Sequence, residues 1–224
     1  MINTRSSGLV NNASDYKFHI LGCGAIGSSA AIQLARMGAR NFVLYDMDKV
    51  ELENIGVSQY TTKDIGKPKV IALRDILIDI NPNCNISSSN KKFNMLYPGG
   101  KYVCILGFDN MDARMDVVKH CTNDLPKSER PDYIIDGRMG AEHYQQYIFH
   151  GQKPGLIQKY TKDWYSDKEG SIEPCNMKAT SYCSSMSGSF IANTVRKLIT
   201  NQPYNRKFSF NFPTMLLQKS VESS

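Results

Sequence analysis

The chain has 224 residues, of which 41% are hydrophobic and 21% charged, and its formal net charge is +6. This composition is ordinary for a globular protein that buries a large core without disulfide or metal cross-links. No apolar run approaches the roughly 20 residues that span a bilayer, no signal peptide is recognisable, and the basic residues form no run, so we expect a cytoplasmic protein without membrane or nucleic-acid partners.

Hydrophobic periodicity predicts alternating strands and helices. A flexible polar arm is expected over residues 1–16. Strands are predicted over 17–21, 41–45, 85–88, 102–107, 133–136, 143–149 and 207–212. Helices are predicted over 25–37, 67–81, 112–121 and 186–200.

Strands that alternate with helices predict one Rossmann-like, doubly wound α/β domain. It would span residues 17–217, with a mainly parallel sheet and antiparallel C-terminal strands. A crossover loop is expected over about 151–185, because this stretch is polar and its periodicity is weak, and a disordered tail over 218–224.

A glycine-rich segment follows the first predicted strand and opens the first helix. Gly22, Gly24, Ala25 and Gly27 belong to this Gly-Cys-Gly-Ala-Ile-Gly segment. The first glycine permits a tight turn, the second lets a phosphate approach the backbone, and the third lets helix and strand pack closely. The helix N-terminus offers N–H groups to an anion.

An acidic residue stands where a nucleotide ribose would be held. Asp46 ends the second strand, 19 residues after Gly27, and can accept hydrogen bonds from ribose hydroxyls. The alternative is that the glycines only make a tight turn. The pattern predicts a nucleotide but does not separate NAD, FAD and ATP.

Three further segments follow in order: Asp-Met-Asp-Lys-Val-Glu-Leu-Glu-Asn from Asp46, Gly-Lys-Pro-Lys ending at Lys69, and Asp-Asn-Met-Asp-Ala-Arg starting at Asp109. Together with the glycine turn, they resemble the ThiF/MoeB/HesA superfamily of E1-like adenylyltransferases, which activate the C-termini of ubiquitin-like proteins. The resemblance covers about residues 18–149 well and 174–199 less strongly. It implies ATP and Mg²⁺ as cofactors and a homodimer or an E1-like heterodimer.

The resemblance assigns roles to individual residues. By analogy, Asp46 holds the ribose, Asn54 and Lys69 contact the nucleotide, and Asp109 holds Mg²⁺, with Asn110 and Arg114 completing its motif. Adenylation joins a carboxylate oxygen to the α-phosphate and expels pyrophosphate, so charge compensation and positioning should dominate over base catalysis. Alternatively, Lys69 is a solvated helix residue, Asp109 only a helix cap, and Arg114 a surface residue.

The sequence departs from the family pattern in two ways. Family members carry an arginine shortly after the asparagine, whereas Ile55-Gly56-Val57-Ser58-Gln59 contains none. Arg138 is a candidate substitute, as is a residue of a partner subunit's arm. The paired Cys-x-x-Cys zinc ligands are also missing, so zinc is not expected.

A cysteine could receive the activated acyl group. Cys175 lies 13 residues before Gly188, a distance similar to that of the thioester cysteine in small E1-like activators of the ufmylation type. The alternative is an ordinary thiol. Cys183 is the second candidate, and Cys23 is expected to pack beneath the nucleotide.

The preferred interpretation is ATP-dependent adenylation of the C-terminal carboxylate of a ubiquitin-like protein, a sulfur-carrier protein or a peptide, with or without a thioester step. Three alternatives stay open. They are a catalytically impaired E1-like partner or scaffold subunit, an NAD-dependent Rossmann oxidoreductase, and a relative of the enzymes that cyclise threonylcarbamoyl groups on transfer RNA.

Overall fold

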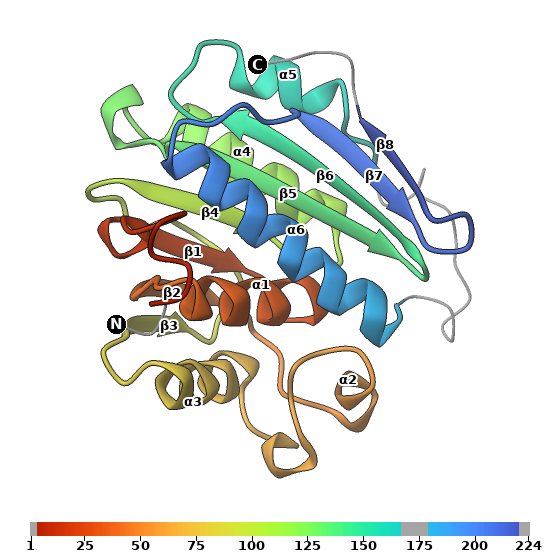
Figure 1. The fold of residues 1–224 in the computed structure, drawn as a ribbon. Helices are drawn as coiled ribbons and strands as arrows, with labels where there is room; N and C mark the ends of the chain where they lie inside the picture. Colours follow the sequence, from red (N-terminus) through yellow and green to blue (C-terminus); the bar gives the residue numbers. More distant parts are fainter. Residues whose placement is uncertain (1–3, 167–178, 220–224) are drawn as a thin grey trace.

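The computed structural model describes residues 4–166 and 179–219. Within them the strands form a single sheet of eight in the order β3-β2-β1-β4-β5-β6-β7-β8 (Figure 1). The strands are β1 (Lys17–Leu21), β2 (Asn41–Tyr45), β3 (Asn85–Ser89), β4 (Tyr102–Leu106), β5 (Tyr133–Gly140), β6 (His143–His150), β7 (Lys207–Asn211) and β8 (Leu216–Lys219).

Strands β1 to β5 are parallel and β6 to β8 are antiparallel, which confirms the predicted fold class. The α-helices are α1 (Ala25–Arg36), α2 (Leu52–Ile55), α3 (Lys69–Ile80), α4 (Met111–Asn123), α5 (Leu156–Thr161) and α6 (Ser181–Ile199). Short 3-10 turns are η1 (Ala13–Asp15), η2 (Thr62–Asp64) and η3 (Lys127–Glu129). No helix in the described part of the chain is both long and apolar enough to span a bilayer.

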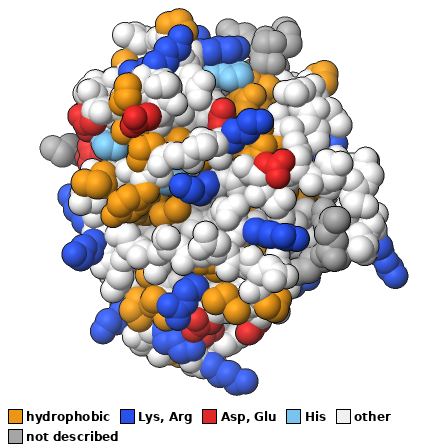
Figure 2. All heavy atoms as spheres, turned by 90° about the vertical axis from the view of Figure 1, so that its left-hand side faces the viewer, with side chains coloured by type: hydrophobic (Ala, Val, Ile, Leu, Met, Phe, Trp, Pro, Cys, Tyr) orange, Lys and Arg blue, Asp and Glu red, His pale blue; other side chains and the backbone are white. Residues whose placement is uncertain are grey.

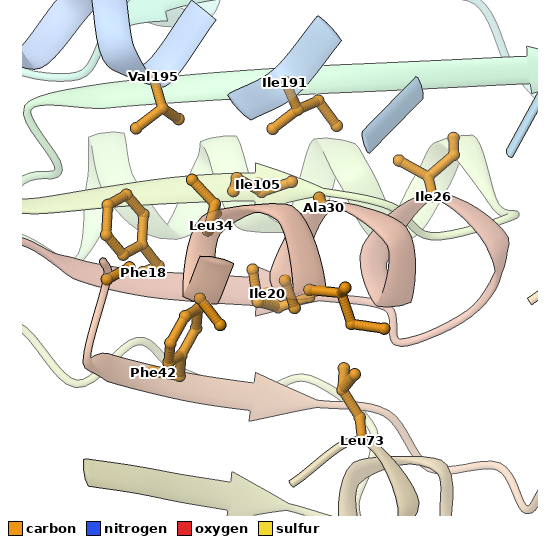
Figure 3. Packing of buried hydrophobic residues seen from close by; sticks show 14 of the residues in the cluster. Phe18, Ile20, Ile26, Ala30, Leu34, Phe42, Leu73, Ile105, Ile191 and Val195 are labelled. Atoms are coloured by element: carbon orange, nitrogen blue, oxygen red, sulfur yellow. The ribbon is translucent and has the colours of Figure 1, made fainter. Parts of the chain in front are cut away.

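Two hydrophobic cores lie on opposite faces of the sheet. One packs α1, α3 and α6 against Phe18, Ile20, Phe42 and Ile105 (Figure 3). The alanine-rich sequence of α1 lets α6 approach closely, and a Cβ on Gly188 of α6 would collide with Ser29. The second core packs α4 and α5 on the other face. The sheet is therefore covered by helices on both sides.

The structure differs from the sequence prediction in the expected loop, tail and arm, and α6 begins at Ser181, inside the expected loop, rather than at residue 186. Helix α5 lies inside the expected crossover loop, because Leu156 and Tyr160 are one helical turn apart and both buried. Strand β8 takes in residues 218 and 219 of the expected tail. Within the expected arm, Val10 and Ala13 are buried, and the Asn12 side chain donates to the Ile199 carbonyl over 2.8 Å.

The sheet order reverses between β1 and β4, so their helices leave toward opposite faces. A crevice opens at the carboxyl ends of strands around such a switch point. The glycine turn follows β1, Asp46 follows β2, and Asp109 comes shortly after β4. Three separate segments of the sequence thus meet at one edge of the sheet.

The opposite edge, where the parallel strands begin, faces the viewer in Figure 2. Lys and Arg side chains are dispersed over this face, with uncharged and hydrophobic side chains between them. The residues of the candidate site lie at the carboxyl ends of these strands, on the other side of the molecule.

Candidate active site

A cleft of about 1080 Å³ occupies the switch point. From β1 and α1 its lining residues are Gly22, Gly24, Ala25 and Ile26. From β2 and the segment between β2 and α3 they are Tyr45, Asp46, Asp48 and Asn54, joined by Lys69 at the start of α3. From β4 and α4 they are Phe108, Asp109, Asn110, Asp112 and Arg114.

The three motif glycines are required for different reasons. Gly22 has φ +92° and a Cβ there would lie 2.7 Å from the Gly107 carbonyl carbon, so only glycine fits. A Cβ on Gly27 would collide with the Gly22 oxygen. Gly24, by contrast, would place its Cβ in open space.

Gly24 is also the N-cap of α1 and supplies no capping side chain. The first N–H groups of α1 therefore face the cleft without a side-chain acceptor at the cap. A helix N-terminus in this state suits an anion, and the missing Cβ leaves room for it.

Asp46 fixes the shape of the turn. Its Oδ2 accepts the Cys23 N–H over 2.7 Å and its Oδ1 accepts the Asp48 N–H over 2.9 Å. Burial raises the pKa of Asp46 above its ordinary value, although these N–H groups and the Lys69 ammonium oppose the shift. Each carboxylate oxygen can accept more than one hydrogen bond, so hydroxyl groups in the cleft can still bind.

Lys69 begins α3 and brings its ammonium into the same cleft. Its Nζ lies 3.0 Å from Oδ2 of Asp48. Burial alone would lower the pKa of Lys69, but the negative charges of Asp46, Asp48 and Asp109 outweigh burial and raise it. Three carboxylates from two loops therefore keep this cation protonated, which is the state that binds phosphate.

Asp109 does not cap the helix after it. Asn110 is the N-cap of α4, and its Oδ1 accepts the Ala113 N–H over 2.8 Å. The Asp109 carboxylate is therefore not used as the helix cap, and it lines the cleft. One carboxylate beside polyphosphate oxygens and water is a common arrangement for Mg²⁺.

Arg114 is buried and braces the loop that carries Asp109. It donates to the carbonyls of Phe108 and Gly137, the latter over 2.9 Å, and forms an ion pair with Asp136. A guanidinium has five N–H donors, so these partners occupy most of it. Its position indicates support of the cleft rather than a free cation aimed into it.

Arg138, the substitute proposed for the missing arginine, lines the other end of the cleft. Its Nε and Nη2 donate to Oδ2 of Asp136 over 2.9 and 2.7 Å, and its Nη1 donates to the Asp163 carbonyl over 2.6 Å. Burial would lower the pKa of Arg138, but the Asp136 carboxylate raises it. The guanidinium also lies over the ring of Tyr147, 4.3 Å from its centroid.

Asn54 lies in α2 and its Oδ1 accepts the Glu51 N–H over 3.0 Å. Its amide group can still donate toward the cleft. All of the residues predicted to bind the nucleotide therefore line this one cleft, except Gly27. Gly27 packs against the backbone of Gly22 instead.

Several cleft residues were not expected from the sequence. Lys91, Lys92 and Phe93 follow β3, and His143 and Gln145 open β6. The lysine pair comes one residue after the carboxyl end of β3, on the same side of the sheet as Asp46, and this position could have been predicted from the sequence. His143 and Gln145 reach the cleft only through the antiparallel pairing of β5 with β6, which local sequence does not reveal.

Cys183, the second candidate for the acyl acceptor, and Cys23, in the glycine turn, are both poor nucleophiles. Cys23 is fully buried, and burial raises its pKa well above the ordinary value. Burial also raises the pKa of Cys183 to about 11. A nucleophilic cysteine needs a stabilised thiolate, so neither fits. Cys175 lies outside the described residues.

The cleft offers a metal ion little coordination by protein alone. Among the described residues, no group of three or more His, Cys, Asp or Glu side chains could hold a metal ion. A divalent cation at Asp109 would therefore depend on oxygens of a bound ligand, which matches Mg²⁺ carried by a nucleotide.

Comparison with known proteins identifies the family of the chain. The model of the ThiF family matches residues 4–223, and the chain belongs to that family. Ubiquitin-like modifier-activating enzyme 5 of Caenorhabditis elegans is 33% identical over 120 residues, covering 47% of this chain and 29% of that protein. The tRNA threonylcarbamoyladenosine dehydratase of Bacillus subtilis is 28% identical over 114 residues, covering 48% and 45%. The chain thus matches less than half the length of these relatives.

Solved structures share the fold. A crystal structure of E. coli MccB with ATP has a TM-score of 0.70 at 16% identity and covers 95% of this chain and 66% of that one. PaaA has a TM-score of 0.72 at 19% identity, covering 96% and 67%. At these identities the likeness establishes architecture alone.

Proposed function

We propose that this protein binds Mg-ATP in the cleft and adenylates a C-terminal carboxylate. The observation that carries the proposal is the convergence of Asp46, Lys69 and Asp109 on one cleft above the Gly22 turn. A triphosphate needs an N–H-rich turn, a cation and a metal ligand in one place, and these residues are of the right kinds.

Each residue has a role in this proposal. Asp46 accepts hydrogen bonds from the ribose hydroxyls. The open backbone at Gly24 and the first N–H groups of α1 receive a phosphate, which Lys69 contacts with its ammonium. Asp109 is the residue that would hold Mg²⁺, and the ion would supply charge compensation for the leaving pyrophosphate.

In the reaction, an oxygen of the acceptor's carboxylate attacks the α-phosphorus. The bond from that phosphorus to the bridging oxygen of the β-phosphate breaks, and pyrophosphate leaves. No proton has to be removed, because the attacking carboxylate is already ionised near neutral pH. The protein contributes alignment and electrostatic stabilisation.

The acceptor is proposed to be a ubiquitin-like or sulfur-carrier protein, or a peptide. The names of the relatives support this class, since one activates a ubiquitin-like modifier. A dimeric state and a cytoplasmic location belong to the same proposal. The test is ATP–pyrophosphate exchange with candidate C-termini, alongside thermal shifts with Mg-ATP and with NAD. Stabilisation by NAD but not by Mg-ATP would overturn the proposal.

A thioester step is a separable part of the proposal. The thiolate of Cys175 would attack the acyl adenylate and release AMP. The Cys175→Ala variant should keep exchange and lose any thioester with the acceptor, whereas Cys183→Ala, the matched control, should keep both. Loss of exchange in Cys175→Ala would make Cys175 structural.

A further inference from the structure

A second pocket lies beneath the connection from β3 to β4. The other connections between the parallel strands contain helices, but residues 90–101 cross the sheet without one. They pass over the face that packs against α4, because Leu96 belongs to the core on that face. A pocket of about 920 Å³, here termed the side pocket, remains between residues 90–97 and strands β1 to β3.

The strand register builds the floor of the side pocket. Lys17, Asn41 and Asn85 lie side by side on β1, β2 and β3, and Val43 lies beside Ser87. Side chains alternate between the two faces of a sheet, and residues at matched positions of neighbouring strands share a face. Val43 belongs to the core on the α4 face, so the whole floor points that way.

The lining of the side pocket is polar and basic. Two lysines, four asparagines and three serines line it, and among the described residues no aspartate or glutamate does. Ammonium, amide and hydroxyl groups can all donate hydrogen bonds, so this lining favours an anion. Asp132, an acid at the same end of the sheet as Lys17, accepts the Tyr102 N–H over 2.9 Å and does not line the pocket.

The two lysines stand at opposite ends of the floor. Lys17 begins β1 and Lys91 follows the end of β3, so the floor between them is roughly 13 Å long. A Cβ on Gly99 would lie 3.6 Å from Nζ of Lys17, which places this ammonium beneath the connection. Within the described part of the chain, no ion pair or hydrogen bond occupies either ammonium. The charge of Lys17 adds to burial in lowering the pKa of His19 on the same strand face.

Lys91 also lines the nucleotide cleft, so the side pocket and the cleft share one cation. The connection is anchored between them. The ring of Tyr97, in the side pocket, stacks against Tyr45, in the cleft, with centroids 6.4 Å apart, and the Leu96 N–H donates to Nε2 of His120 in α4 over 3.2 Å. A ligand that drew Lys91 into the side pocket would therefore remove its charge from the cleft.

We propose that the side pocket binds a small sugar phosphate and that its occupancy weakens the binding of Mg-ATP in the cleft. The two ammonium groups, on long flexible stems, bind the phosphate, and the amide and hydroxyl side chains bind the hydroxyls of the sugar. A volume of about 920 Å³ exceeds what a bare phosphate ion needs and lies in the range of small-molecule sites. The coupling rests on the proposed function, whereas the site itself does not.

The first test is lysine acetylation of the full chain by N-hydroxysulfosuccinimide acetate, read by mass spectrometry. Lys17 lines the side pocket but not the cleft, so its protection reports on this pocket alone. We expect saturating ribose 5-phosphate to slow acetylation of Lys17 at least about threefold, and to leave the exposed Lys153 unchanged. Ribose lacks the phosphate and should give no protection. Equal protection by inorganic phosphate would overturn the assignment of a sugar.

A charge placed on the floor provides the matched variant. Asn85→Asp adds a negative charge with almost no change of shape, so it should abolish the protection of Lys17 by repelling the phosphate. Asn123→Asp makes the same change at an exposed residue of α4 outside the side pocket and should keep the protection. Circular dichroism checks that both variants fold. No protection in the wild type, or full protection in Asn85→Asp, would overturn the site.

Calorimetric titration with a non-hydrolysable Mg-ATP analogue tests the coupling. Saturating ribose 5-phosphate should weaken nucleotide binding about fivefold in the wild type and have no effect in Lys91→Gln or Asn85→Asp. An unchanged affinity in the wild type would overturn the coupling. Weakening that persists in Asn85→Asp would place the sugar phosphate in the cleft and overturn the inference. Failure of the proposed function would look different, because Lys17 would still be protected while no nucleotide bound.

Discussion

The Nζ atom of Lys69 lies 3.0 Å from Oδ2 of Asp48, so the cation proposed to meet the phosphates is held by an exposed carboxylate. Lys69 is largely buried, whereas the Asp48 side chain is 55% exposed. A bound phosphate would compete with Asp48 for the ammonium. The ion pair therefore keeps Lys69 charged and in place, and it leaves the ammonium able to exchange Asp48 for a phosphate.

This competition predicts that Asp48→Asn tightens ATP binding. The amide cannot hold Lys69 as an ion pair, so phosphate meets less competition and less negative charge. Because the pair is partly exposed, we expect a gain of about 0.5 kcal/mol, or two- to threefold in Kd. Asp79→Asn, at an exposed position of α3, should change nothing. Weaker ATP binding by Asp48→Asn would show that Asp48 is itself a ligand for the nucleotide complex.

Substitution of Asp109 should impair the reaction, whereas substitution of Asn110 should impair the stability of the fold. Asp109→Ala is expected to reduce pyrophosphate exchange by at least about 100-fold with little change in Tm, since a charge-stabilising group of this kind contributes about that much. Asn110→Ala removes the cap of α4 and should lower the free energy of unfolding by about 1 kcal/mol. The measurements are exchange rates and thermal melts of both variants. An unchanged exchange rate in Asp109→Ala would refute its magnesium role.

Alanine substitution of Gly27 should destabilise the fold, whereas alanine substitution of Gly24 should weaken ATP binding. Gly27→Ala places a Cβ against the Gly22 oxygen and should destabilise the fold by about 3 kcal/mol. At Gly24 the new Cβ meets no protein atom within 4 Å, so the fold should survive while the methyl group obstructs the phosphate. Urea denaturation and ATP titration of both variants test this. Normal ATP affinity in Gly24→Ala would argue that the phosphates lie elsewhere.

Because His19 is buried, we expect the free energy of unfolding to depend on pH. Burial lowers the pKa of His19 to about 3, and its Nε2 atom is buried without a hydrogen-bond partner among the described residues. The unfolded chain binds the proton near pH 6.5, so the stabilisation is present above that pH and is lost as pH falls toward 3. We expect this residue to contribute a slope of up to about 1.4 kcal/mol per pH unit in that window.

The His19→Phe variant should lose this contribution, and His143→Gln serves as the control because His143 lies at the half-exposed edge of β6. Urea unfolding between pH 4 and 8 provides the measurement. Equal slopes in the wild type and His19→Phe would contradict a buried, neutral imidazole.

The parallel half of the fold could be predicted because its signals are local. Alanine-rich helix, buried strand and glycine turn are each contained within a few residues, and the carboxyl edge of a parallel sheet then brings Asp46, Lys69 and Asp109 together. The lysine pair after β3 obeys the same rule and could have been added.

The remainder depends on contacts distant in sequence. Helix α5 is only six residues long and is stabilised by burying Leu156 and Tyr160 rather than by helix propensity. Arg114 looked like either a ligand contact or a surface residue, and only the position of Asp136 on β5 explains its burial.

Calorimetric titration of the full chain with ATP in the presence of Mg²⁺ tests the central claim most directly. We expect one saturable site per chain in the wild type, and at least about tenfold weaker binding in each of Asp46→Ala, Lys69→Ala and Asp109→Ala. Absence of binding to the wild type, or affinity indifferent to all three substitutions, would contradict a nucleotide site built from these residues.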